Sequence, residues 1–327
     1  MDIAILGAGV AGSFLANILE DRHNIRVYDG NLMRGHYCAW GCFKNLLGEE
    51  LTRIGLNVDD YILCTPQTLI LNGIYIKLRS NQVSIDKPKM LKDIWPQTKV
   101  IPRHVPMVKQ AGADLTVNAT AKPLGKYHEI ATKQSKANLV GTEEKTIYIN
   151  IDPKYVGYSW AFPLDSEGKE YHLGAGCVNA DPAILIDKLL KRYKIEAIGE
   201  KCQCNRSIAV VNPDEVEIVK NGIVSIGEAA GLVHPLTGEG TLSALESANL
   251  LAGSLNDDTF PSGFEDALKT TFLNEYKNPY KIWGLMEKHP RLSWVLGVKY
   301  LLNRTKARAQ PVITNRVRLK IARILLT

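Results

Sequence analysis

The run IAILGAGVAG at residues 3–12 decides the fold. Its first four residues are apolar, which is typical of a central parallel strand buried on both faces. Residues 7–12 have the spacing Gly-x-Gly-x-x-Gly, and apolar residues then recur at helical spacing. A second apolar strand, residues 25–28, ends at Asp29. The order strand, glycine turn, helix, strand and acid predicts a Rossmann-like dinucleotide-binding unit.

Each residue type in the glycine turn has a physical role in holding a pyrophosphate. Gly7 allows the tight turn, Gly9 lets the backbone approach the phosphates, and Gly12 lets the helix pack closely on the strand. Val10 and Ala11 open the helix, whose N–H groups and dipole favour an anion. The turn therefore predicts a nucleotide contact at all five positions.

Asp29 indicates which dinucleotide binds. It stands 20 residues after Gly9, where a carboxylate accepts hydrogen bonds from an adenosine ribose and repels a 2′-phosphate. FAD or NAD is therefore favoured over NADP. The alternative interpretation is a glycine-rich turn without a ligand.

A second polar cradle lies far along the chain. Residues 222–231 read GIVSIGEAAG and residues 235–241 read PLTGEGT, followed by a helical pattern. NAD alone does not need this cradle, whereas a flavin does. Its ribityl hydroxyls need an acidic acceptor, and a helix N-terminus stabilises the anionic reduced ring. The cofactor prediction is FAD. Its second set of predicted contacts is Gly227, Glu228, Pro235, Gly238, Gly240 and Thr241.

Composition places the chain among globular proteins. Of 327 residues, 45% are hydrophobic and 23% are charged, which excludes disordered and fibrous classes. No apolar run approaches the ~18 residues of a membrane-spanning helix, and the N-terminus lacks the basic region of a signal peptide. The six cysteines form no CxxC pair, which disfavours a zinc ribbon. We expect a reduced, cytoplasmic protein without a metal site.

The charge is distributed unevenly along the chain. From Lys277 onward there are 12 Lys and Arg against one acid, whereas the remainder is mildly acidic. Helices are predicted at residues 260–276, 279–286, 290–303 and 312–326. The last is basic and amphipathic, which favours an anionic membrane surface at the inner face of the cell membrane over nucleic acid. A solvated helical surface is the alternative.

Four segments carry a resemblance to a known family. They are GEAAG at 227–231 with PLTGEGT at 235–241, YSWAFP at 158–163, CAWG at 38–41 and VSIDK at 83–87. With them the chain resembles the geranylgeranyl reductase family of FAD enzymes, within the p-hydroxybenzoate-hydroxylase-like flavoproteins. It differs from the family's patterns at Glu228, Thr241 and Lys87, where the family has Asp, Ile and Arg.

The resemblance implies an α/β fold in which a Rossmann-like FAD-binding domain is combined with a discontinuous substrate domain of mixed or antiparallel sheet. The predicted boundaries are 1–58, 84–122 and 206–262 for the FAD-binding domain, 59–83 and 123–205 for the substrate domain, and 263–327 for a basic helical C-terminal region. The segment 42–110 is shorter than the family's, which predicts that part of the substrate-domain sheet is missing.

The resemblance also implies an activity and a substrate site. The activity is reduction of isoprenoid C=C bonds, as in geranylgeranyl lipids, by a hydride from N5 of the reduced flavin. Tyr158, Trp160 and Phe162 then line an apolar slot for a prenyl chain beside the flavin. The alternative is an ordinary sheet face packed on a core.

The family's cysteine loop implies flavin contacts from Cys38, Ala39 and Gly41, and VSIDK implies one from Lys87. No proton donor stands out. Cys38 and His234 are weak catalytic candidates, with a small buried thiol and a loop-packing imidazole as the alternatives. Cys202 and Cys204 face one side of a predicted strand, but two thiols do not make a metal site.

Residues 113–122 lack the Asp-Gly motif that the hydroxylases of the larger group use for flavin and NADPH. Two electron donors therefore stay open, NAD(P)H and a ferredoxin-like electron-transfer protein. The alternative enzyme is a flavin monooxygenase or halogenase of the same fold. The alternative outside catalysis is an FAD-binding, membrane-associated paralogue, which the short 42–110 segment favours.

Overall fold

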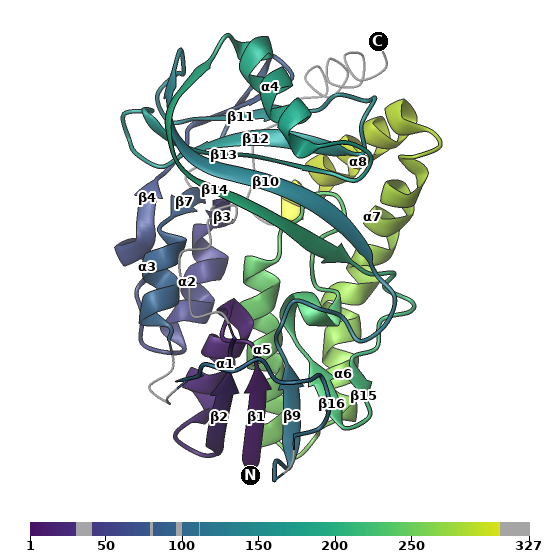
Figure 1. The fold of residues 1–327 in the computed structure, drawn as a ribbon. Helices are drawn as coiled ribbons and strands as arrows, with labels where there is room; N and C mark the ends of the chain where they lie inside the picture. Colours follow the sequence, from purple (N-terminus) through teal and green to yellow (C-terminus); the bar gives the residue numbers. More distant parts are fainter. Residues whose placement is uncertain (31–40, 79–80, 96–99, 111, 308–327) are drawn as a thin grey trace.

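The computed structural model describes residues 1–30, 41–78, 81–95, 100–110 and 112–307, without the side chains of 200–203 and 301–307. A six-stranded sheet lies at one end of the molecule and a seven-stranded sheet at the other, with helix α5 between them (Figure 1). This α/β arrangement agrees with the predicted fold class.

The six-stranded sheet has the strand order β15-β16-β9-β1-β2-β8. Every neighbouring pair is parallel except β15 with β16. Its strands are β1 (Asp2–Leu6), β2 (Asn24–Tyr28), β8 (Val100–Ile101), β9 (Leu115–Asn118), β15 (Val219–Lys220) and β16 (Ile223–Ser225). Because β1 lies in the middle, between β2 and β9, its apolar residues 3–6 are fully buried, as predicted.

Two long helices cover this sheet. The helix α1 (Val10–Leu19) follows β1 and the helix α5 (Thr241–Asn256) follows the second glycine-rich loop. They lie side by side (Figure 1), and Phe14 of α1 and Leu245 of α5 are completely buried in one shared core. The packing brings the N-termini of both helices to the carboxyl edge of the sheet, facing the seven-stranded sheet.

The seven-stranded sheet has the order β14-β10-β13-β12-β11-β5-β6. Its strands are β14 (Glu196–Val210), β10 (His128–Val140), β13 (Glu170–Cys177), β12 (Gly157–Pro163), β11 (Thr146–Asn150), β5 (Thr68–Leu71) and β6 (Ile74–Lys77). All pairs are antiparallel except β11 with β5. The alternating pattern of 123–205 is thus an antiparallel sheet, as predicted, interrupted by the helix α4 (Pro182–Tyr193).

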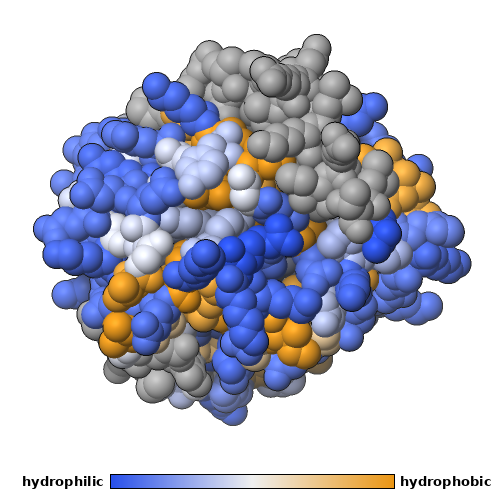
Figure 2. All heavy atoms as spheres, turned by 90° about the horizontal axis from the view of Figure 1, so that it is seen from above, coloured by the Kyte–Doolittle hydropathy of each residue, from blue (hydrophilic) through white to orange (hydrophobic). Residues whose placement is uncertain are grey.

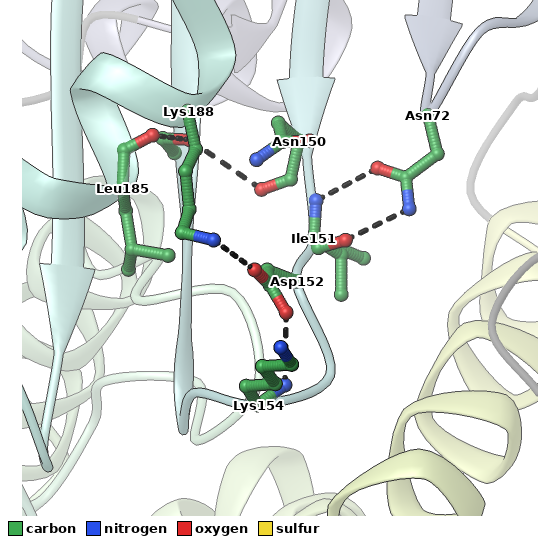
Figure 3. Close-up of polar contacts among 8 residues, drawn as sticks. Asn72, Asn150, Ile151, Asp152, Lys154, Leu185 and Lys188 are labelled. Atoms are coloured by element: carbon green, nitrogen blue, oxygen red, sulfur yellow. Dashed lines mark hydrogen bonds and ion pairs between the residues drawn. The ribbon is translucent and has the colours of Figure 1, made fainter. Parts of the chain in front are cut away.

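The helix α4 is fixed to one face of this sheet by a polar network (Figure 3). Asn72 sits at φ +49° in an Asn-Gly turn, where its side chain accepts from the N–H of Ile151 and donates to its C=O, each at 2.8 Å. Lys188 of α4 pairs with Asp152 at 2.6 Å. We call this face of the sheet the α4 face and the opposite one, turned toward α5, the inner face.

A third sheet connects the two large ones. It has the order β3-β7-β4, with β3 (Gly41–Phe43), β7 (Gln82–Ile85) and β4 (Ile62–Cys64), and is flanked by α2 (Lys44–Thr52), the 3₁₀ turn η1 (Val58–Tyr61) and α3 (Lys87–Asp93). Its strands come from both predicted domains, and the predicted boundary at 205–206 falls inside β14. The domain boundaries stay a prediction.

The C-terminal region is helical, but its boundaries differ from the prediction. The helix α6 (Ser262–Leu268) continues through a π-helical turn η3 (Lys269–Leu273) into α7 (Asn274–Leu285), and α8 (Pro290–Ala307) follows. The prediction that a new helix begins at Pro279 was wrong, because the helix accommodates this proline in its interior. The predicted helix at 312–326 lies outside the described residues.

The surface adds two observations. Seen from above, the side of α4 is mainly hydrophilic with hydrophobic side chains scattered between the polar ones (Figure 2). Among the described residues, every helix is too short or too polar to span a bilayer.

Candidate functional site

The first glycine turn is built by close contacts between backbones. Gly7 has φ +104°, and a Cβ there would stand 2.5 Å from the carbonyl oxygen of Ala119 at the end of β9. A Cβ on Gly12 would stand 2.0 Å from the carbonyl oxygen of Gly7. A Cβ on Gly9 would meet nothing within 4 Å. The first and third glycines are therefore required by the fold itself, whereas Gly9 leaves open space before α1.

That open space lies at an uncapped helix end. Gly9 is the N-cap of α1, without a side-chain cap, and the first turn, which begins with Val10 and Ala11, contains no acidic residue. Because the first N–H groups of a helix have no partner within it, this end is suited to an anion. The sequence missed Ala119, whose backbone fixes the turn and which only the strand order brings here.

Asp29 ends β2 beside the same turn. Its Oδ2 accepts a hydrogen bond from the N–H of Ala8 at 2.8 Å, so the acid also braces the glycine turn. The next residue, Gly30, lies under the imidazole of His104, since a Cβ on Gly30 would stand 2.2 Å from that ring. His104 follows β8 and is a second residue that the sequence did not reveal, because β8 is distant from β2 along the chain.

The second cradle begins in the 3₁₀ turn η2 (Gly227–Ala230) after β16. Gly227 has φ +59° and its N–H donates to Ser247 of α5 at 2.9 Å. Glu228 accepts from the N–H of Ala209 in β14 at 2.7 Å. The side chain of Glu228 thus connects the second cradle to β14 of the seven-stranded sheet.

Burial raises the pKa of Glu228 to about 7, since the low dielectric disfavours the charged form. The N–H of Ala209 and the charge of Lys87 act in the opposite direction without cancelling this effect. Lys87 is buried at the start of α3 and its charge also acts on Cys42. The charge of Lys87 therefore acts on Glu228 of the second cradle, and its predicted flavin contact stays a prediction.

Residues 235–241 lead into α5. Gly240 is the N-cap of α5, again without a side-chain cap, and Thr241 begins the helix. Pro235 is buried at the start of this loop. Gly238 has φ +67° and lies under Ile208 of β14, whose Cδ1 would be 3.2 Å from a Cβ at that position. The hydroxyl of Tyr158 donates to the carbonyl of Thr237. The loop is thus held directly beneath the inner face of the seven-stranded sheet.

The three predicted aromatic residues form one row along β12 on the inner face. Tyr158 and Trp160 have ring centroids 5.4 Å apart. The Trp160 ring covers Gly174, where a Cβ would stand 2.6 Å from it, and its indole N–H donates to Nδ1 of His172 at 3.2 Å. Phe162 packs on Gly41 of β3, where a Cβ would stand 2.8 Å from the ring. The row therefore extends from β3 to the second cradle.

His234 packs against the C-terminal helices. It is buried between Tyr276 and Tyr300 of the C-terminal helices, with ring centroids at 5.3 and 6.2 Å, and its Nδ1 accepts from the N–H of Leu236. This environment supports the interpretation of a loop-packing histidine. Cys38 and Ala39 lie outside the described residues, so their predicted contacts stay predictions.

The cysteines whose side chains are described are free and buried. The sequence passed over Cys42, which lies on β3 beside the site, but burial raises the pKa of its thiol to about 12. Cys204 is buried on β14, and the side chain of Cys202 is not described. Within the described part of the chain, no three His, Cys, Asp or Glu residues gather as a metal site would require.

The arrangement of these residues fits an elongated dinucleotide with a planar ring system. Two uncapped helix N-termini, at Gly9 and Gly240, face the same region, and each is preceded by a glycine with positive φ. The open space at Gly9 is suited to a pyrophosphate. The aromatic row extends from Gly41 to Thr237 on the inner face of the seven-stranded sheet. FAD has this shape and charge distribution.

Together, the two glycine cradles and the antiparallel sheet above them define the class of fold, that of FAD-dependent oxidoreductases and monooxygenases. A geranylgeranyl bacteriochlorophyll reductase-like protein from Thermoplasma acidophilum matches with a TM-score of 0.65 and 16% identity, over 98% of this chain and 94% of that one. PqsL from Pseudomonas aeruginosa, a probable FAD-dependent monooxygenase, matches with 0.64 and 14%, over 89% and 96%.

The flavin-dependent brominase Bmp2 matches with a TM-score of 0.63 and 14% identity, over 99% of this chain and 92% of that one. In sequence, the uncharacterized protein MJ1182 of Methanocaldococcus jannaschii is 26% identical in an alignment 306 residues long, and the match covers 77% of this chain and 82% of that protein. No model of a protein family matches the chain. At these identities the solved structures establish the fold and leave the reaction to be inferred from the site.

Proposed function

We propose that this protein is an FAD-dependent reductase of isoprenoid C=C bonds. The FAD pyrophosphate would lie at the N-terminus of α1, its adenosine ribose beside Asp29, and its ribityl chain beside Glu228. The N-terminus of α5 at Gly240 would face the pyrimidine edge of the ring. Each of these positions combines an open backbone donor or a carboxylate with the matching part of the cofactor.

The observation that carries the proposal is the aromatic row on β12. It forms an apolar wall that begins over Gly41 and ends at the loop carrying Thr237, on the side of the sheet that faces the cradles. A prenyl chain offers little except apolar surface, and burying that surface contributes about 25 cal/mol per Å². Tyr158, Trp160 and Phe162 supply such a surface along the length of the slot.

When bound and reduced, FAD supplies a hydride from its N5 atom. The residues of this chain would hold the alkene against the ring and exclude water from it. Trp160 is 6% exposed and its N–H is already bonded to His172. It therefore offers the substrate only a rigid apolar face. Tyr158 is fixed by its bond to Thr237 in the same way.

The electron donor and the membrane contact are further proposals. NAD(P)H and a ferredoxin-like protein are both compatible with the absence of an Asp-Gly motif at residues 113–122. The excess of Lys and Arg after Lys277 favours a peripheral contact with anionic lipid, from which a hydrophobic substrate would be taken up.

The test is an anaerobic single turnover. The purified, FAD-loaded protein is reduced with dithionite, geranylgeranyl-containing lipid is added, and flavin reoxidation is followed together with mass analysis of the lipid. We expect reoxidation and a product heavier by the two hydrogens of one reduced double bond. A flavin that stays reduced beside intact lipid would contradict the proposal.

A monooxygenase or halogenase is the second candidate, because PqsL and Bmp2 match this chain nearly as well as the reductase-like protein does. Its test is oxygen uptake driven by NADPH in the presence of an aromatic substrate. Rapid substrate-dependent uptake would favour this candidate. A protein that binds FAD and turns over in neither assay would favour a non-catalytic paralogue.

A further inference from the structure

One row of residues crosses the inner face of the seven-stranded sheet. Cys204, Gln134, Gly174 and Trp160 stand opposite one another on β14, β10, β13 and β12. Residues that are directly opposite in an antiparallel sheet point to the same face. Gln134 therefore shares the face of Trp160, while its neighbour Ser135 shares the α4 face with Ala161.

The hydrogen bonds around Gln134 fix the orientation of its amide. The hydroxyl of Thr132 donates its only proton to the carbonyl oxygen of Arg206 at 2.9 Å. It can then only accept from Gln134, whose amide nitrogen lies 3.4 Å from the Thr132 oxygen. The amide NH₂ of Gln134 is thus turned toward Thr132, and its carbonyl oxygen, Oε1, points away from it.

This carbonyl oxygen is a buried acceptor without a donor. The Gln134 residue is 5% exposed, and none of the described residues donates to its Oε1. Leaving an amide oxygen unpaired in the interior is destabilising, so native proteins rarely keep one without a partner. Its register neighbour Gly174 has no side chain that could serve.

The row lies above the place proposed for the flavin ring. Two residues after Trp160 on β12, Phe162 contacts Gly41 of β3. Two residues before it, Tyr158 bonds to Thr237 of the second cradle. Trp160 stands between these two contacts, and Gln134 stands in the same cross-strand row on β10, with β13 between them. A molecule bound beneath Trp160 would therefore have Gln134 on its flank.

We propose that Oε1 of Gln134 accepts a hydrogen bond from the bound substrate. The substrate is then an isoprenoid that carries a hydroxyl or N–H group near its reacting double bond, and not a bare hydrocarbon chain. Gln134 acts as a specificity-determining residue, and Thr132 positions its amide. This inference rests on the proposed function, since it assigns the donor to the substrate of that same slot.

The experiment compares two ligands with the same prenyl chain, of which one has a hydroxyl donor and the other has a methyl group in place of its proton. Geranylgeraniol has a hydroxyl proton, and geranylgeranyl methyl ether has the same chain without it. Binding of each to the full-length, FAD-loaded protein is followed by tryptophan fluorescence, for the native chain and for Gln134→Met. Gln67→Met is the matched control, because Gln67 is an exposed glutamine of the same sheet region.

We expect the native protein and Gln67→Met to bind the alcohol at least tenfold more tightly than the ether, since the ether leaves the acceptor unpaired. Gln134→Met should bind both ligands equally, with the affinity of the ether. Equal binding of both ligands by the native protein, or a preference that persists in Gln134→Met, would overturn the inference while leaving the prenyl substrate intact.

If neither ligand binds, the proposal of a prenyl substrate is contradicted. Thermal unfolding of Gln134→Met then tests whether the amide of Gln134 is kept for a ligand or for stability. A Gln134→Met protein that melts at or above the native temperature supports an acceptor kept for a ligand of another class. A clear decrease in melting temperature, absent from Gln67→Met, would show that the amide is a structural partner and would overturn the inference.

Thr132 gives an independent readout of positioning. Thr132→Val removes the hydroxyl that orients the amide, so the preference for the alcohol should decrease, because the amide is free to rotate. Thr132→Ser retains the hydroxyl and should restore the preference. Equal preference in Thr132→Val and the native protein would contradict the assigned orientation.

Discussion

The two large sheets present different chemistry to the region between them. The six-stranded sheet presents backbone, namely the glycine turn at residues 7–12 and the uncapped ends of α1 and α5. The seven-stranded sheet presents side chains, namely the aromatic row of β12 and the amide of Gln134. Recognition of a ligand by backbone N–H groups in the glycine turns depends on the absence of a Cβ. Recognition by side chains can change through substitutions that leave the strand itself intact. The comparison suggests that the glycine turns of the six-stranded sheet are constrained by the lack of room for a Cβ, and the inner face of the seven-stranded sheet by side-chain packing.

The largest effect is expected from a Cβ in the glycine turn. Gly12→Ala would place it 2.0 Å from a backbone oxygen that cannot move without shifting β1, so we expect a loss of more than about 4 kcal/mol in the free energy of unfolding. Urea unfolding of the purified chain measures it. Gly9→Ala is the matched control. A Cβ at position 9 meets no protein atom within 4 Å, so the free energy of unfolding should be unchanged while FAD affinity decreases roughly tenfold or more.

Stability lost in both variants, or in neither, would contradict the distinction drawn between the two glycines.

In the seven-stranded sheet, Trp160→Ala should reduce the free energy of unfolding by about 3 kcal/mol, because it leaves a cavity above Gly174. Trp160→Phe retains most of that packing and should leave FAD affinity within about threefold of native. A side chain on the inner face of the seven-stranded sheet contributes little to recognition of the cofactor by backbone groups. FAD titration by fluorescence tests this. A large loss of FAD affinity in Trp160→Phe would break the comparison between the two sheets.

Glu228 connects the second cradle to the seven-stranded sheet and should make the free energy of unfolding of the ligand-free protein depend on pH. Its folded-state pKa is raised to about 7, so the folded state binds a proton more tightly than the unfolded chain. Its contribution is complete below the unfolded pKa of about 4.3 and is lost as the pH rises through about 7. Between these values stability should decrease by up to about 3 kcal/mol.

Glu228→Gln retains an oxygen for the N–H of Ala209 but does not titrate. Urea unfolding of this variant across pH 5–8 should therefore show a flatter profile than that of the native protein. Two parallel profiles would indicate that the carboxyl of Glu228 is not the titrating group.

The smallest effect is expected on the α4 face. Burial opposes the charged form of Asp152, but its bonds from Lys188 and the N–H of Lys154 outweigh this and hold its pKa below the ordinary value. Because Lys188 is 37% exposed, Lys188→Met should cost less than about 1 kcal/mol. The difference should be present above the unfolded pKa of about 3.9 and vanish as the pH falls through the folded pKa.

Chemical unfolding at pH 7 and at pH 3 measures this difference. A loss of the same size at both values would show that the methylene packing of Lys188, and not its charge, is responsible.

Local sequence signals predicted much of the fold and part of the site. The apolar strand at residues 3–6, the glycine turn and the acid at Asp29 are close together along the chain, so their spacing alone specifies a strand, a turn and a helix end. The alternating pattern of 123–205 likewise predicted antiparallel strands. The interior proline of α7 was misjudged, because a helix supported by packing tolerates Pro279 where an isolated one would end.

What the sequence could not determine depends on residues brought together from distant strands. Ala119 closes the glycine turn, His104 covers Gly30, and Ala209 bonds to Glu228, yet each lies many residues from its partner. Gln134 carried no signal at all, because a glutamine on a strand is ordinary until the register places it opposite Gly174, where no described residue donates to its Oε1. The sequence by itself determined the backbone cradles, since φ angles and helix ends are local properties. The tertiary structure alone decided which side chains surround the slot, since hydrogen-bond partners and burial are set by strand order and register.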